Sequence, residues 1–136
     1  MNAMEKVAWT EFLVSVLAVV VVTCLYPWLG ERASGAFGLL GLMVFGALFL
    51  RRHGSRVVVD ERDRQIAQRA TSIGVSSAWM TLLLALIAAG LWSNYLRIGA
   101  VSTSFLNWLT WTQFAVCYGV KGLVAIIAYR RQPHAS

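Results

Sequence analysis

Four long apolar runs, separated by short polar breaks, make up most of this 136-residue chain. They lie at 12–29, 33–50, about 73–92 and about 104–129, and the last is interrupted once by Lys121. The hydrocarbon core of a membrane is about 30 Å thick, and about 20 helical residues are needed to cross it. Each run is long enough to do so. The sequence therefore predicts that lipid is the main solvent of this chain.

Composition and pattern favour membrane helices over other folds. Hydrophobic residues make up 58% of the chain and charged residues only 13%, about half the charged share of a typical soluble domain. In lipid every backbone amide must be bonded within the chain, and runs without polar–apolar alternation are typical of helices rather than barrel strands. We predict an all-α integral membrane fold, a single domain over 1–136 with four transmembrane helices. The spans are expected at about 9–29, 34–51, 71–93 and 104–129.

The distribution of the basic residues predicts the orientation of the chain. Its formal net charge is +6. Basic residues gather on one side of the predicted fold, which holds Lys6, six arginines of segment 51–70, Arg130 and Arg131. The opposite side has only Arg32 and Arg97. By the positive-inside rule, segment 51–70 and both termini lie in the cytoplasm, in a multi-pass protein of the inner membrane.

The sequence contains no motif of a catalytic, metal-binding or nucleotide-binding site. Cys24 and Cys117 lie in different spans and lack the paired thiols that a membrane thiol oxidoreductase needs. His53 and His134 stand alone in polar segments, which is poor material for a metal site. We therefore expect no enzyme activity, no cofactor and no metal. Direct nucleic-acid binding is disfavoured, because the basic residues are spread over three short segments at a membrane surface.

Glycines are concentrated in the second apolar run, at Gly35, Gly38, Gly41 and Gly46. Small residues let helices approach closely in lipid, where van der Waals contact drives association. Ser34 and Gly38 also fit the small-xxx-small pattern. We therefore predict that these glycines pack the second span against a neighbouring helix.

Segment 52–70 is the most distinctive polar stretch, and it predicts a cytoplasmic loop followed by a helix that continues into the third span. Asp60 is a suitable N-cap, and acidic residues occupy the first turn after it. No helix breaker follows Glu61 before Gly74. The extension is either a solvated helix held by local charge pairs, or a docking surface for a cytoplasmic partner or anionic lipid headgroups. The docking candidates are Asp60, Glu61, Arg62, Asp63, Arg64 and Arg69.

The run Asp60-Glu61-Arg62-Asp63, followed by Ile66 and by Ala70 before an apolar helix, carries a family resemblance. It resembles a motif of a family of small uncharacterised prokaryotic membrane proteins with four spans. In that family an acidic-acidic-arginine-acidic motif precedes the third span, and the gene often lies beside one for a helix-turn-helix regulator. The resemblance covers 60–73 and the layout of the spans. It implies no known chemistry, but it implies a regulatory or sensing role.

Polar residues in the fourth run recur at spacings of three or four and share one helix face. They are Thr110, Gln113, Cys117 and Lys121. A lysine at this depth costs about 3 kcal/mol on insertion scales, and the cost calls for a partner. Glu11 in the first span lies near the same side of the membrane, and Ser15 follows it by one turn. We predict that Lys121 meets Glu11, as a packing ion pair or as a proton- or ligand-responsive pair.

These features favour a small interaction or regulatory protein of the inner membrane, acting through helix packing and the charged helix extension. The expected partners are membrane lipid, further copies of the chain or the other subunits of a membrane complex, and a cytoplasmic regulator. A small secondary transporter, or a proton- or ligand-responsive membrane protein, is the alternative, and it would use Glu11 and Lys121.

Overall fold

The computed structural model describes residues 3–43, 60–96 and 100–131, and these ranges are almost entirely helical. The elements are α1 (Ala3–Leu29), the 3-10 helix η1 (Gly30–Met43), α3 (Glu61–Tyr95) and α4 (Thr103–Arg131). α3 has 35 residues, so it is about 52 Å long at the helical rise of about 1.5 Å per residue. This length exceeds the thickness of a hydrocarbon core by several turns.

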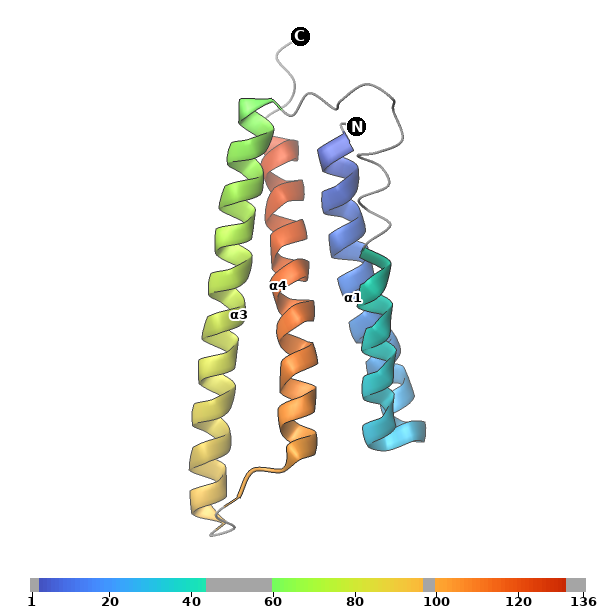
Figure 1. The fold of residues 1–136 in the computed structure, drawn as a ribbon, viewed down its shortest axis with the longest axis vertical. Coiled ribbons are helices and arrows are strands. Elements are labelled where there is room, and N and C mark those ends of the chain that lie inside the picture. Colours follow the sequence, from blue (N-terminus) through green and yellow to red (C-terminus); the bar gives the residue numbers. More distant parts are fainter. Residues whose placement is uncertain (1–2, 44–59, 97–99, 132–136) are drawn as a thin grey trace.

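α4 lies between α1 and α3 and packs along both of them (Figure 1). η1 folds back against α1, and the chain reverses at Gly30. The φ of Gly30 is 55°, a left-handed conformation that glycine adopts without the penalty of a Cβ atom. The start of α1, the start of α3 and the end of α4 all lie at the same end of the molecule (Figure 1).

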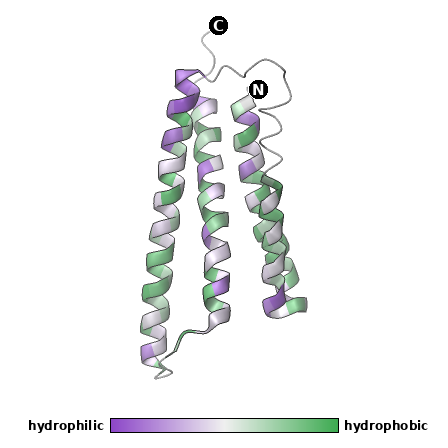
Figure 2. Ribbon diagram, viewed as in Figure 1, coloured by the Kyte–Doolittle hydropathy of each residue, from purple (hydrophilic) through white to green (hydrophobic). Residues whose placement is uncertain are grey.

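Three helices are long and apolar enough to cross a membrane, which indicates a membrane protein. The surface agrees, because α3 exposes large apolar side chains along its length. Figure 2 shows the hydrophilic residues of α3 gathered at its first turns, with a mostly apolar helix beyond them. Lipid can cover such a surface without the cost that water would impose.

The prediction of four transmembrane helices is wrong, because the described residues contain only three helices that could cross a membrane. The described part of the predicted second span forms η1, a 3-10 helix. Gly35, Gly38 and Gly41 repeat every three residues, which matches the three residues per turn of a 3-10 helix. Glycine also disfavours an α-helix by about 1 kcal/mol relative to alanine. Apolar length alone did not distinguish the two conformations, and residues 44–51 lie outside the described ranges.

Two small clusters of buried side chains hold the helices together. The first joins α1, α3 and α4 at the end that holds the chain's N-terminus, and consists of Ala8, Ile66, Ala70, Ala125 and Ile126. The second joins α1, η1 and α4, and consists of Ala18, Val22, Phe37, Leu40 and Ala115. Trp108 of α4 completes the second cluster, since its ring makes edge contacts with Tyr26 and Phe37. Half of these ten residues are alanines, as expected where helices pack in lipid.

The structure places the closest helix contacts at glycines other than those expected from the sequence. A Cβ atom at Gly35, Gly38 or Gly41 would meet nothing within 4 Å. A Cβ atom at Gly74 would lie 2.6 Å from the Cys117 carbonyl oxygen, and one at Gly122 would lie 2.7 Å from the Phe12 nitrogen. Gly46 lies outside the described residues. Close packing therefore depends on one glycine of α3 and one of α4.

Substituting alanine at Gly74 or Gly122 should destabilise the helix assembly, because each new methyl group would collide with backbone atoms of a neighbouring helix. Overpacking of this kind costs about 1–3 kcal/mol. Gly38→Ala is the matched control, since its methyl group would enter open space. Thermal unfolding in detergent measures the effect. A melting temperature that falls as far for Gly38→Ala as for Gly122→Ala would contradict this account.

Candidate functional site

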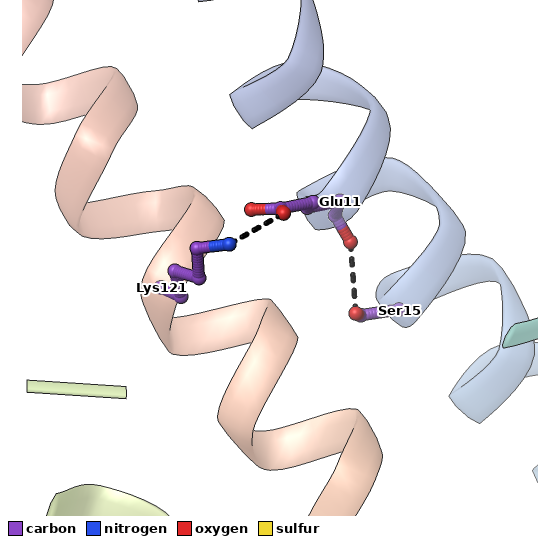
Figure 3. Close-up of polar contacts among 3 residues, drawn as sticks. All are labelled: Glu11, Ser15 and Lys121. Atoms are coloured by element: carbon purple, nitrogen blue, oxygen red, sulfur yellow. Dashed lines mark hydrogen bonds and ion pairs between the residues drawn. The ribbon is translucent and has the colours of Figure 1, made fainter. Parts of the chain in front are cut away.

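Lys121 of α4 and Glu11 of α1 form an ion pair inside the helix assembly. The Lys121 Nζ donates to the Glu11 Oε1 at 2.6 Å (Figure 3). The Lys121 side chain is 25% exposed and the Glu11 side chain 14% exposed. The predicted pairing of these two residues is confirmed, and each charge has the partner that its depth requires.

Glycines bring the two neighbouring helices against α4 at the level of Lys121. The Cβ atom that Gly74 lacks would lie 2.9 Å from the Lys121 Cβ, so α3 passes directly beside this lysine. Gly122 lets α1 approach from the other side, with Ala8 and Phe12 at the contact. The lysine backbone is thus held between two helices, and its side chain extends toward α1.

Ser15 supports α1 beside the ion pair without bonding to the carboxylate. Its Oγ donates to the Glu11 backbone oxygen at 2.8 Å (Figure 3). Ser15 is only 2% exposed, and a Cβ atom at Gly119 of α4 would lie 3.4 Å from its Cβ. The Ser15 hydroxyl is therefore hydrogen-bonded within α1, and its small side chain lets α4 pack closely at Gly119.

The residues of the polar stripe of α4 face different surroundings. Thr110 is exposed, and its Oγ1 donates to the Leu106 carbonyl oxygen at 2.9 Å. Gln113 faces α3, and with its amide nitrogen toward that helix it donates to the Ala78 carbonyl oxygen at 2.5 Å. Gln113 and Cys117 also line a cavity between α3 and α4. Lys121 of the stripe reaches α1, where it meets Glu11.

A small cavity of about 50 Å³ lies beside the ion pair, between α1, α3 and α4. Its polar lining consists of Glu11, Lys121 and Tyr129, and alanines from all three helices supply much of the rest. A site of this size holds about three water molecules, and the polar atoms present can bond them. The pair can therefore be hydrated although it lies within the helix assembly.

The charged helix extension begins as the sequence predicts. Asp60 is the N-cap of α3, and its carboxylate accepts from the Glu61 backbone nitrogen at 2.7 Å. The Arg64 nitrogen donates to the Asp60 carbonyl oxygen at 3.1 Å, which closes the first turn. The expected start of the third helix near Glu61 is confirmed.

The six docking candidates fall on different faces of the extension. Asp60, Glu61, Arg64 and Arg69 are exposed, and Arg62 is half-buried. Asp63 is only 8% exposed and shares the buried face with Ile66 and Ala70. The exposed face is completed by Gln65 and Gln68. We call this face the charged face of α3: Glu61, Arg64, Gln65, Gln68 and Arg69.

Asp63 fastens the extension to α4, an interaction that the sequence analysis missed. The Tyr129 hydroxyl donates to its carboxylate. At the same end of the molecule Arg130 lies over the Trp9 ring, 5.4 Å from its centre. A signal for Asp63 was present in the sequence, because it precedes Ile66 by three residues and Ala70 by seven. This spacing places it on the apolar face of the helix.

Comparison with protein-family models, with curated proteins and with solved structures finds no match. Within residues 3–43, 60–96 and 100–131, no group of three or more histidine, cysteine, aspartate or glutamate side chains could hold a metal ion. The candidate site is therefore described by its own chemistry. It consists of an ion pair beside a small cavity at a junction of three helices, with the charged face of α3 at the same end.

Breaking the ion pair should cost more than removing it. Lys121→Met or Glu11→Gln leaves one charge without its partner, so each change should destabilise the protein. We expect a loss of up to about 3 kcal/mol, the lower end of the range for breaking buried ion pairs, because this pair is partly exposed. The double variant should recover much of that loss. A double-mutant cycle on thermal unfolding in detergent measures the coupling. Additive losses would show that the two charges have separate partners.

Proposed function

We propose that this protein is a small regulatory or interaction protein of the inner membrane, whose charged face of α3 binds a cytoplasmic partner protein. The observation that carries the proposal is the continuity of α3 from Glu61 to Tyr95. The charged face and the apolar span belong to one rigid helix. A partner bound to the first turns therefore acts on the same element that packs in the membrane.

The packing of the extension supports this role. Its buried face rests on α4 through Ile66 and Ala70, and Asp63 is bonded to Tyr129. The opposite face is exposed and carries charges and amides. A helix fixed along one side and polar along the other presents its side chains in a constant geometry. Such pre-organisation lowers the entropic cost of binding.

The charge pattern of this face favours a protein over a lipid surface. Anionic headgroups attract clusters of lysine and arginine with few acidic residues among them. Here Glu61 lies one turn from Arg64, and Gln65 and Gln68 stand between the basic residues. A mixed surface of this kind matches a partner of complementary pattern and rejects others. A cytoplasmic regulator, as the family resemblance implies, is the partner class that we propose.

The proposed orientation places this end of the molecule in the cytoplasm. The starts of α1 and α3 and the end of α4 lie together (Figure 1), and Lys6, Arg64, Arg69, Arg130 and Arg131 lie in these segments. Basic residues are retained on the cytoplasmic side during insertion. Both termini are then cytoplasmic, and further copies or other membrane subunits would pack on the apolar faces.

The cavity beside Glu11 and Lys121 supports a second candidate, a proton- or ligand-responsive membrane protein. Water at a charged pair provides a route for protons that a dry pair lacks. The double-mutant cycle distinguishes the candidates when it is repeated at several pH values. A coupling that is constant around neutral pH favours the packing role and the proposed docking function.

Accessibility labelling tests the orientation. In a Cys24→Ala/Cys117→Ala background, a cysteine at Gln68 should react only with reagents added from the cytoplasmic side. A cysteine at Ser102 should react only from the other side, because Ser102 lies at the opposite end of α3 and α4. Both positions are exposed, so packing does not decide the result. The reverse pattern would overturn the proposed orientation.

Site-specific crosslinking in cells tests the docking function. A photo-reactive residue at Gln68 should yield a discrete protein adduct, and Arg64→Glu with Arg69→Glu should abolish it by reversing the charge of the face. Arg131→Glu is the matched control, since Arg131 is also basic and exposed at this end but belongs to α4. Loss of the adduct with the control, or adducts to lipid alone, would refute a protein partner on this face.

A further inference from the structure

α3 and α4 are held together at one end and separate toward the other. Gly74 marks the close contact, where a Cβ atom would lie 2.6 Å from the Cys117 carbonyl oxygen. From there the two helices diverge toward the connection between them (Figure 1). Trp92 lies about 27 Å beyond Gly74 along the helix axis, at about 1.5 Å per residue. The separation therefore develops within the membrane-spanning part of α3.

Two cavities follow this separation, and the larger lies where the helices are farthest apart. The first has a volume of about 220 Å³ and lies between Ala78 of α3 and Gln113 of α4. The second has a volume of about 480 Å³ and is lined by α3, by residues just before α4, and by Phe105 of α4. Ligand pockets of proteins typically measure about 300–1,000 Å³. The second cavity falls within that range.

The walls of the larger cavity differ from the rest of α3. The side of α3 toward the cavity carries Ala85 and Ala89, one turn apart, and then Trp92. The leucines of the same turns point elsewhere, and Leu84 and Leu91 are 62% and 66% exposed, whereas Trp92 borders the cavity at its exposed edge. Alanines on a membrane helix usually mark a close helix contact. Here they face a space that the described residues leave open.

The chemistry and shape of this space select its occupant. The lining residues are aliphatic or aromatic except for Ser93 and Ser102, which carry hydroxyls. The Ser102 Oγ accepts from the Phe105 nitrogen at 3.2 Å, which leaves its proton free to donate. A slender hydrocarbon chain that ends in a hydrogen-bond acceptor fits both the volume and the hydroxyls.

We propose that this groove between α3 and α4 binds one acyl chain of a membrane phospholipid. The chain lies along Ala85 and Ala89, and Trp92 and Phe105 flank it near its polar end. The ester carbonyl of the lipid accepts hydrogen bonds from Ser93 and Ser102, near the membrane surface where α3 ends. The site lies at the end of the molecule away from the charged face of α3, and its occupation does not depend on the proposed cytoplasmic partner.

The test uses the full chain reconstituted in vesicles that contain a phosphatidylcholine with a diazirine in its acyl chain. After illumination, label mapped by mass spectrometry should be enriched at Phe105, a groove residue that is only partly exposed, over the outward residues Leu84 and Leu91. Ala89→Phe, which places a ring in the groove, should remove most of the groove label and leave the outward label unchanged. Ile87→Phe, on the outward face at 58% exposure in the wild type, is the matched control and should change neither.

Equal labelling of the groove and the outward face in the wild type would overturn the proposal, because it would indicate ordinary surrounding lipid. Groove label that persists in Ala89→Phe would overturn it as well. Thermal unfolding shows whether each variant is folded. If Ala89→Phe does not fold, Ser93→Ala with Ser102→Ala takes its place, and loss of the enrichment at Phe105 supports the site. Enrichment that is unchanged in that double variant would refute the hydrogen bonds to the lipid ester.

Discussion

The close approach of α4 to both of its neighbours at Lys121 is the constraint on which the structure depends. Gly122 admits α1 and Gly74 admits α3, and the ion pair with Glu11 lies at the same level. In lipid no hydrophobic force joins one apolar helix to another, so packing and polar contacts must do so. The two glycines allow the close packing, and the charge-assisted hydrogen bond between Lys121 and Glu11 is the polar contact. The remaining contacts of α4 follow from this fixed crossing.

This arrangement links the water-facing end of the molecule to its membrane-spanning part. Asp63 and Tyr129 hold the first turns of α3 on α4, and Ile66 and Ala70 continue the contact to Gly74. Displacement of the extension would therefore be transmitted to the contact beside Lys121. A partner that prefers one position of the extension could shift the assembly only by its difference in affinity for the two positions. The proposed regulatory role requires no more than this.

The start of α3 and the ion pair could be predicted from the sequence, whereas the nature of the second apolar segment and the closest contacts could not. Asp60 marks the start of α3 in the sequence, because N-capping depends only on the cap residue and the residues that follow it. Glu11 and Lys121 are isolated charges in the predicted spans, and lipid leaves them few alternative partners. The length of an apolar run does not show whether it forms an α-helix or a 3-10 helix, so the conformation of η1 could not be predicted. Among the chain's 11 glycines, the importance of Gly74 and Gly122 depends on which helix faces them.

The two ends of the helix assembly differ in what fills the space beside their small residues. At the Gly74 end, small residues are matched by close helices, and their atoms are in contact. At the Trp92 end, alanines line a space that the described helices do not fill. Unfilled volume forfeits dispersion contacts, so a membrane protein can keep such a wall only if lipid or another molecule supplies the missing atoms. The small residues of α3 therefore serve helix packing at one end and, on our proposal, lipid binding at the other.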